Sequence, residues 1–279
     1  MTQTPDYRVP ATACVLHKRL GLWKDCLAFD VNLGCSGYVY GMQIVCSLLK
    51  STGCKYGLLL AGDTSSKGIA PEDQSVTMLF GDGGSATLLE TQKNAEYIHI
   101  ACRTDGSKYK AIIMPSGCFR NIDGERQRSV WADGNKRSDY DLYMNGVDVF
   151  AFSISEVPVM IKDFLKTQGT DKDTYDDYFF HQANCYILKQ ITKKCRLIKD
   201  KVAISMDRYG NISVTSIPLT ICDKYGNEIG GKKRNLLTCG FGIGLSWGIA
   251  SFELDQNDIY PILETDEYYE CETNKEWRG

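Results

Sequence analysis

The order of apolar runs and helical segments constrains the fold of this chain more than any other feature. Short apolar runs at residues 26–32 and 56–63 predict buried strands, and the segment between them carries apolar residues at helical spacing. A second series begins with a long amphipathic segment at 144–169 and continues with a strand at 176–184. Strands that alternate with helices in two successive series predict an α/β architecture made of two related halves.

Glycine-rich turns mark further pairs of strands. Residues 75–90 predict two strands joined by a Gly-Asp-Gly-Gly turn, and another strand follows at 96–103. Residues 235–255 predict two strands joined by the turn GFGIG. Between the two series, residues 104–141 are polar and irregular, and a loop of this length inside a compact protein is usually functional or mobile.

Composition excludes several classes of protein. The net charge of -3 lacks the excess of positive charge that is typical of proteins that bind nucleic acid or an anionic membrane. The first residues lack the pattern of a signal segment, and no apolar run approaches the roughly 20 residues that span a bilayer, so a cytoplasmic location is expected. Twelve cysteines occur without a C-x-x-C pair, and histidine is scarce, so zinc-ligand spacing is absent. Most of these cysteines are expected to be small buried side chains in a reducing cell.

Cys35 lies in the sequence DVNLGCSGYVYG, after an apolar run and before a helical one. A cysteine at a helix start experiences the positive end of the helix dipole and free N–H groups, which lower the pKa of its thiol. Gly34 and Gly37 let the chain turn sharply and leave room for a substrate. The arrangement is similar to the nucleophile elbow of hydrolases. On spacing alone, an inert buried thiol remains the alternative.

Two more polar residues fall at places where sites form. His181 ends an apolar strand, and sites in open α/β sheets collect at the carboxyl ends of strands, so it is either a base or donor, or a structural histidine. Asn211 lies in the turn DRYGNIS and is either a turn residue or an amide that donates to a developing oxyanion. The GFGIG turn at 240–244 precedes a strand rather than a helix. That context argues against a dinucleotide loop and predicts N–H groups directed into a pocket.

Taken in order, four segments resemble the β-ketoacyl-acyl-carrier-protein synthase III family of thiolase-like condensing enzymes: FDVNLGCSGYVYG, FFHQAN, DRYGNISVTSIPL and GFGIGLSWG. The resemblance implies an α/β, five-layered αβαβα fold with two pseudo-duplicated halves, usually dimeric. The halves are expected at residues 1–143 and 144–254, followed by an acidic C-terminal extension at 255–279. The N-terminal half is expected to be incomplete, because the family carries a further strand and helices ahead of the position of Met1.

The resemblance also assigns roles to individual residues. It makes Cys35 the nucleophile, and it makes His181 and Asn211 the donors that stabilise an enolate. The backbone N–H groups of Cys35 and Ile243 would form the oxyanion hole. Three residues match positions along the substrate channel, the last of them across the dimer: Phe241, Met144 and Val9.

The implied reaction is a decarboxylative Claisen condensation in fatty-acid or related acyl-chain biosynthesis. An acyl thioester, carried on coenzyme A or acyl carrier protein, would form an acyl-Cys35 intermediate and then react with malonyl-acyl carrier protein. No metal or redox cofactor is expected. The expected partners are an acyl carrier protein and a second copy of the chain. Three lysines either meet the acidic carrier or form a solvated helix face: Lys189, Lys193 and Lys194.

The sequence departs from the family at two positions that contact coenzyme A. Gln74 stands where an arginine is usual, and Val147 stands where an asparagine is usual, so an acyl carrier protein becomes relatively more plausible as the donor. Two alternatives to the condensing reaction remain. One is acyl transfer to oxygen or nitrogen without decarboxylation, and the other is a shortened, inactive homologue that keeps the fold but no competent site.

Overall fold

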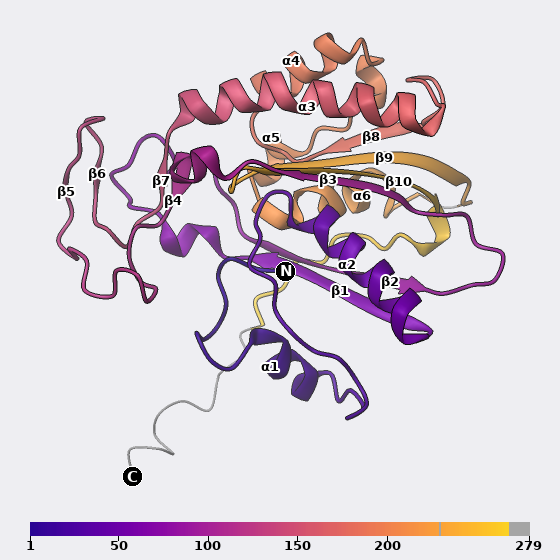
Figure 1. Ribbon diagram of the computed structural model, residues 1–279, viewed down its shortest axis with the longest axis horizontal. Coiled ribbons are helices and arrows are strands. Elements are labelled where there is room, and N and C mark those ends of the chain that lie inside the picture. Colours follow the sequence, from indigo (N-terminus) through magenta and orange to yellow (C-terminus); the bar gives the residue numbers. More distant parts are fainter. Residues whose placement is uncertain (229, 268–279) are drawn as a thin grey trace.

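A four-stranded sheet forms the centre of the computed structural model, which describes residues 1–228 and 230–267 (Figure 1). Its strands lie in the order β3-β10-β9-β8, with the bounds His99–Thr104, Ser246–Asp255, Lys233–Gly242 and Asp177–Phe180. Strand β8 runs parallel to β9, and the other neighbours are antiparallel. Every residue of β8 is buried, as is typical of a strand in a sheet that is covered on both faces.

Helices and a second sheet form layers around this centre. Helices α3 (Gly146–Gln168) and α4 (Cys185–Cys195) cover one face of the four-stranded sheet (Figure 1). Helices α2 (Gly37–Thr52) and α6 (Ser216–Tyr225) lie between it and the antiparallel pair β1 (Tyr56–Asp63) and β2 (Gly83–Glu90). The sequence of helix, sheet, helix and sheet confirms the predicted thiolase-like α/β class.

Two hydrophobic cores hold these layers together. One core packs Ile161 of α3 and Ile191 of α4 against the sheet, and both side chains are fully buried. The other core joins Val39 of α2 to Leu59 of β1 on the opposite face. Burying an apolar side chain of this size contributes roughly 1.5–3 kcal/mol, so the α2 layer is fixed from both sides. Helix α2 ends at Thr52, and Gly53 follows it in the left-handed conformation at φ 71°, which is common for the residue after a helix.

Short elements complete the fold. The remaining helices are α1 (Thr12–Arg19) and α5 (Met206–Tyr209), with short 3-10 turns at Ser65–Gly68, Gly106–Ala111, Lys199–Lys201, Ser213–Thr215 and Gln256–Asp258. The long loop at 104–141 carries most of the two-residue strands, namely β4 (Ile112–Ile113), β5 (Ser129–Val130) and β6 (Lys136–Arg137), and β7 (Tyr143–Met144) follows it. These strands pair as β4 with β7 and β5 with β6. In the described part of the chain, no helix is both long and apolar enough to cross a membrane.

Two strand predictions are wrong. Residues 26–32 are extended but pair with no strand among the described residues, and Leu27 and Phe29 are 67% and 48% exposed. Residues 75–79 form turns, so only the second strand of the predicted 75–90 pair exists, as β2. Both segments have strand composition, but a strand forms only where a neighbouring strand takes up its backbone hydrogen bonds. The predicted C-terminal extension at 255–279 is described only as far as residue 267.

A buried ion pair fixes the long loop to the body of the protein. The Arg137 guanidinium lies 2.6 Å from an oxygen of Asp73, and both side chains are fully buried. Asp133 accepts a second pair of hydrogen bonds from the same guanidinium. The rings of Trp131 and Tyr143 lie 5.0 and 5.2 Å from the guanidinium carbon. A buried charge is costly without its partner. Removing one member of this pair should therefore lower the free energy of unfolding far more than removing one member of an exposed ion pair.

Asp73→Ala is therefore expected to lower the free energy of unfolding by about 3–5 kcal/mol, since it leaves Arg137 buried with only Asp133. Urea unfolding followed by circular dichroism measures this change. The matched control is Glu72→Ala, which removes an exposed carboxylate 3.4 Å from Lys136 and should change stability little. Equal effects of the two substitutions would show that the loop does not depend on the buried pair.

Candidate active site

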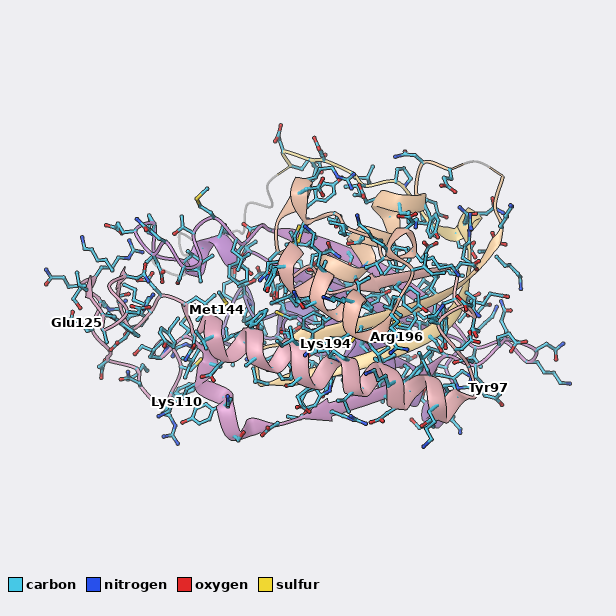
Figure 2. The ribbon with its side chains drawn as sticks, turned by 90° about the horizontal axis from the view of Figure 1, so that it is seen from above. Tyr97, Lys110, Glu125, Met144, Lys194 and Arg196 are labelled. Carbon is cyan, nitrogen blue, oxygen red and sulfur yellow. The ribbon has the colours of Figure 1, made fainter. Side chains whose placement is uncertain are left out.

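A cavity of about 310 Å³ brings together residues from both series of strands and helices. Six of the residues predicted to act in the site line it: Cys35, Met144, His181, Asn211, Phe241 and Ile243. Ser213 lines it as well. Viewed from above, Met144 lies on the side of the molecule where Lys110 and Glu125 also lie, away from Tyr97 (Figure 2). The cavity is thus next to the long loop, whose Met114, Ser116 and Cys118 contribute to its wall.

Cys35 lies directly before the start of α2. Ser36 is the N-cap residue of this helix and Gly37 is its first residue. The Cys35 side chain is partly accessible, through the cavity, and protein atoms surround it on the other sides. The backbone N–H groups of Ile243 and of Cys35 itself, together with the Ser213 side chain, lie close enough to the sulfur to favour its thiolate form. The two predicted oxyanion donors therefore converge on the thiol.

The predicted lowering of the Cys35 pKa is wrong for the protein without substrate. Loss of solvent around the sulfur raises the pKa of the thiol to about 11, and the negative charge of Asp63 adds to this effect. The hydrogen bonds from Ile243, Cys35 and Ser213 act in the opposite direction but are weaker. The helix dipole was the basis of the prediction, whereas burial, which depends on distant parts of the chain, determines the outcome.

His181 follows β8 and is almost completely buried at 2% exposure. Its backbone N–H donates to the Cys239 carbonyl on β9, and its ring packs edge-on against Phe241 with 5.5 Å between ring centres. Burial lowers the pKa of the imidazole to about 4, so the ring is neutral at pH 7. The Nδ1 atom is buried without a hydrogen-bond partner among the described residues. A neutral imidazole carries one N–H, so His181 can donate one hydrogen bond, and the main chain of Ser213 lies beside the ring as one acceptor for it.

Asn211 is held in place by its own turn. Its backbone N–H donates to the Leu79 carbonyl, and its carbonyl accepts from the Gly81 N–H, which places Phe80 and Asn211 in a parallel bridge. Its side-chain Oδ1 accepts a hydrogen bond from the Ser213 N–H at 3.0 Å. Since the oxygen is used in this way, the NH₂ group faces the other side of the amide and is available as a donor.

The GFGIG turn lies so close to Cys35 that side chains on two of its glycines would not fit. A Cβ atom on Gly242 would lie 2.6 Å from the Cys35 Cβ and 2.8 Å from its sulfur. A Cβ atom on Gly240 would lie 2.9 Å from the Cys35 carbonyl oxygen. Glycine is therefore required at both positions for β9 to reach the nucleophile turn, which supports the predicted direction of the turn into a pocket.

The other predicted residues lie elsewhere. Val9 is 83% exposed and does not line the cavity in the single chain, so its predicted role across a dimer stays a prediction. Val147 is 80% exposed at the start of α3. The Gln74 N–H bonds the Asn135 side chain within the long loop. Among the described residues, no group of three or more histidine, cysteine, aspartate or glutamate side chains has the arrangement of a metal site.

Sequence reasoning missed two residues beside the thiol. Ser213 is 4% exposed, bonds both Cys35 and Asn211, and has a φ of 48°, a conformation that is uncommon outside glycine. Asp63 is 3% exposed at the end of β1, and its Oδ1 accepts hydrogen bonds from Thr2 and Gln3. No sequence motif marks either residue, although the serine is two positions from Asn211.

Comparison with known proteins identifies relatives of this chain. The 3-oxoacyl-[acyl-carrier-protein] synthase III family matches residues 29–106, and its C-terminal domain matches residues 165–254. A putative 3-oxoacyl-[acyl-carrier-protein] synthase 3 from Campylobacter jejuni is 34% identical over 264 residues, which cover 93% of this chain and 72% of that protein. A β-ketoacyl-[acyl-carrier-protein] synthase III from Clostridium perfringens is 32% identical, covering 91% and 76%.

Solved structures agree with these relatives. The crystal structure of a 3-oxoacyl-(acyl-carrier protein) synthase from Burkholderia xenovorans is 39% identical, with a TM-score of 0.84, and the match covers 94% of this chain and 74% of that one. The structure of another 3-oxoacyl-(acyl-carrier-protein) synthase III is 37% identical, with a TM-score of 0.85 and coverage of 90% and 76%. The chain belongs to the 3-oxoacyl-[acyl-carrier-protein] synthase III family.

Proposed function

We propose that this protein condenses an acyl thioester with a malonyl thioester, with loss of carbon dioxide, through an acyl group bound to Cys35. The observation that carries the proposal is the convergence of Cys35, His181, Asn211 and the Ile243 N–H on one cavity. A nucleophile, two N–H donors at the nucleophile, and two further donors are the groups that this reaction needs.

In the first step, the Cys35 sulfur attacks the carbonyl carbon of the acyl thioester. The carbonyl oxygen becomes an oxyanion that the N–H groups of Cys35 and Ile243 stabilise, because both lie beside the sulfur. The intermediate collapses as the bond from carbon to the leaving sulfur breaks. The products are acyl-Cys35 and the free carrier thiol, which takes up the proton that Cys35 loses.

In the second step, the bond between the malonyl carboxylate and C2 breaks and carbon dioxide leaves. The electron pair passes into an enolate, whose oxygen accepts hydrogen bonds from His181 and from the Asn211 NH₂ group. The C2 carbanion attacks the acyl-Cys35 carbonyl, a carbon–carbon bond forms, and the bond to the cysteine sulfur breaks. The Cys35 thiolate that leaves takes up a proton from solvent and becomes the thiol again. A neutral His181 suits the role of donor, since its lowered pKa keeps it uncharged throughout the neutral range.

The finer assignments extend this proposal to carriers and assembly. The relatives are named for acyl carrier protein, so we assign it as the carrier of the malonyl group. Coenzyme A remains an alternative carrier of the acyl group.

Lys189 and Lys193 on α4 are basic residues that could meet the acidic carrier, whereas Lys194 donates to the Ile154 carbonyl and so also joins α4 to α3. A homodimer, the two halves at residues 1–143 and 144–254, and a cytoplasmic location complete the proposal.

A labelling experiment tests the acyl-enzyme. The protein is incubated with radiolabelled acyl-coenzyme A or acyl-acyl carrier protein, and the labelled peptide is identified by mass spectrometry. Wild type and Cys118→Ser should each gain one acyl group, whereas Cys35→Ser should gain none. Cys118 is the matched control because it is a second thiol that lines the same cavity. Label on Cys118, or no label with any acyl chain length, would contradict the proposed nucleophile.

The pH dependence of alkylation tests the protonation state of the nucleophile. Because burial raises the pKa of the Cys35 thiol to about 11, the rate of its alkylation by iodoacetamide should still rise about tenfold per pH unit between pH 7 and 9.5. A short model peptide with one cysteine, with an ordinary thiol pKa near 8.5, should already level off in that range. A Cys35 rate that is level above pH 7.5 would show that α2 lowers the pKa after all.

A further inference from the structure

The N-cap residue of α2 does not cap its helix. Ser36 occupies this position, where a serine side chain commonly accepts a hydrogen bond from a backbone N–H of the first turn and adds about 1 kcal/mol of stability. The Ser36 hydroxyl makes no such bond. It is fully buried and lies 2.6 Å from the hydroxyl of Ser246, a residue 210 positions later in the chain.

The Ser246 hydroxyl continues this contact to the GFGIG turn. Its Oγ donates to the Ile243 carbonyl at 2.7 Å, and the side chain is 2% exposed. A carbonyl can only accept, so the single Ser246 proton is used for Ile243. The Ser36 hydroxyl must then be the donor to Ser246. The result is a directed chain from Ser36 through Ser246 to Ile243, which we call the hydroxyl chain.

The two ends of the hydroxyl chain adjoin the two N–H donors at the thiol. Ser36 follows Cys35 directly in sequence, and Ile243 supplies the second N–H itself. These donors come from segments that are joined by no strand pairing, since one precedes α2 and the other follows β9. Main-chain contact alone brings Gly240 against Ser36, with 2.9 Å from an added Cβ to the Ser36 Cα. The hydroxyl chain adds a direct bonded connection between them.

We propose that Ser36 and Ser246 are positioning residues that hold the N–H groups of Cys35 and Ile243 at the separation needed to bind the oxyanion. The inference rests on the proposed function, because it assigns these N–H groups to the acyl-transfer step. Neither hydroxyl touches the reacting atoms. Their contribution is to keep two donors from different segments aimed at one point, which matters because oxyanion stabilisation depends on donors that are already in position.

The test compares two reactions of the same sulfur. Acylation by an acyl thioester forms a tetrahedral oxyanion, whereas alkylation by iodoacetamide displaces iodide and forms none. Both consume the Cys35 thiolate, so any change in its pKa cancels in the ratio of the two rate constants. Single-turnover acylation and alkylation are followed by intact-protein mass spectrometry at one pH for wild type, S36A, S246A and the double variant.

The S246A ratio of acylation to alkylation is expected to fall about tenfold, less than the 100-fold or more that follows loss of a whole oxyanion donor. The S36A ratio should fall as well. Either substitution alone breaks the hydroxyl chain, so the second has nothing further to break. The ratio of the double variant should therefore match that of S246A and not show the product of both effects. S205A is the matched control: Ser205 is buried outside the cavity, and its hydroxyl donates to Thr220, whose hydroxyl donates in turn to the Ser216 carbonyl, so its ratio should equal that of wild type.

The outcomes separate the inference from the proposed function. If S36A and S246A both keep the wild-type ratio, the hydroxyl chain has no positioning role, and the acyl-enzyme proposal stands. If wild type is alkylated at Cys35 but acylated by no thioester, the proposed function fails and the assigned role fails with it. Should S246A not fold, S36A decides the question alone, because it breaks the same chain from the other end.

Discussion

The whole site depends on the close approach of two main-chain segments, where the end of β9 meets the turn that carries Cys35. Glycines at 240 and 242 make that approach possible, since a Cβ atom at either position would lie within 3 Å of atoms of Cys35. The contact joins segments that are more than 200 residues apart, one from each series of strands and helices. The strands behind it, β9 and β8, carry His181 to the same cavity. The convergence of Cys35, His181 and the GFGIG turn is therefore a consequence of how the two series of strands and helices pack.

Close packing also determines the chemistry of the groups it brings together. Burial raises the pKa of the Cys35 thiol and lowers the pKa of His181, so both are uncharged at pH 7 without substrate. An uncharged site avoids the cost of burying an ion pair. In the proposed reaction, negative charge develops on the substrate, and N–H donors stabilise it far better in a water-poor cavity than in bulk solvent. On this proposal the protein holds the donors in place and the substrate supplies the charge.

Local sequence predicted the elements whose patterns are self-contained. The helical spacing that follows Cys35, the two strands joined by the GFGIG turn in 235–255, and the apolar run at 56–63 all correspond to observed elements. The segment 26–32 has the same composition as a strand, but its fate depends on whether another strand lies beside it, which its own residues do not encode. Long-range pairing explains this error.

The site shows the same difference between what local sequence encodes and what long-range contacts determine. The residues alone leave an inert thiol, a structural histidine and a turn asparagine as alternatives. The resemblance of four ordered segments to the synthase III family is what selects Cys35, His181 and Asn211, which the structure brings to one cavity. The Cys35 pKa was mispredicted because the helix-dipole rule is local and desolvation is not. Ser213 was missed because its φ of 48° is usually a sign of glycine, and nothing in its identity suggests such a conformation.

The central claim is that the protein forms a carbon–carbon bond with loss of carbon dioxide, and the stoichiometry of the complete reaction tests it most directly. An acyl thioester and malonyl-acyl carrier protein, labelled in the free carboxylate, are mixed with the enzyme, and labelled carbon dioxide is counted against 3-oxoacyl product. The account predicts one carbon dioxide for each product, with both falling together by about 100-fold or more in His181→Ala and Asn211→Ala. An acyl ester or amide formed without carbon dioxide, or carbon dioxide release that both variants retain, would contradict it.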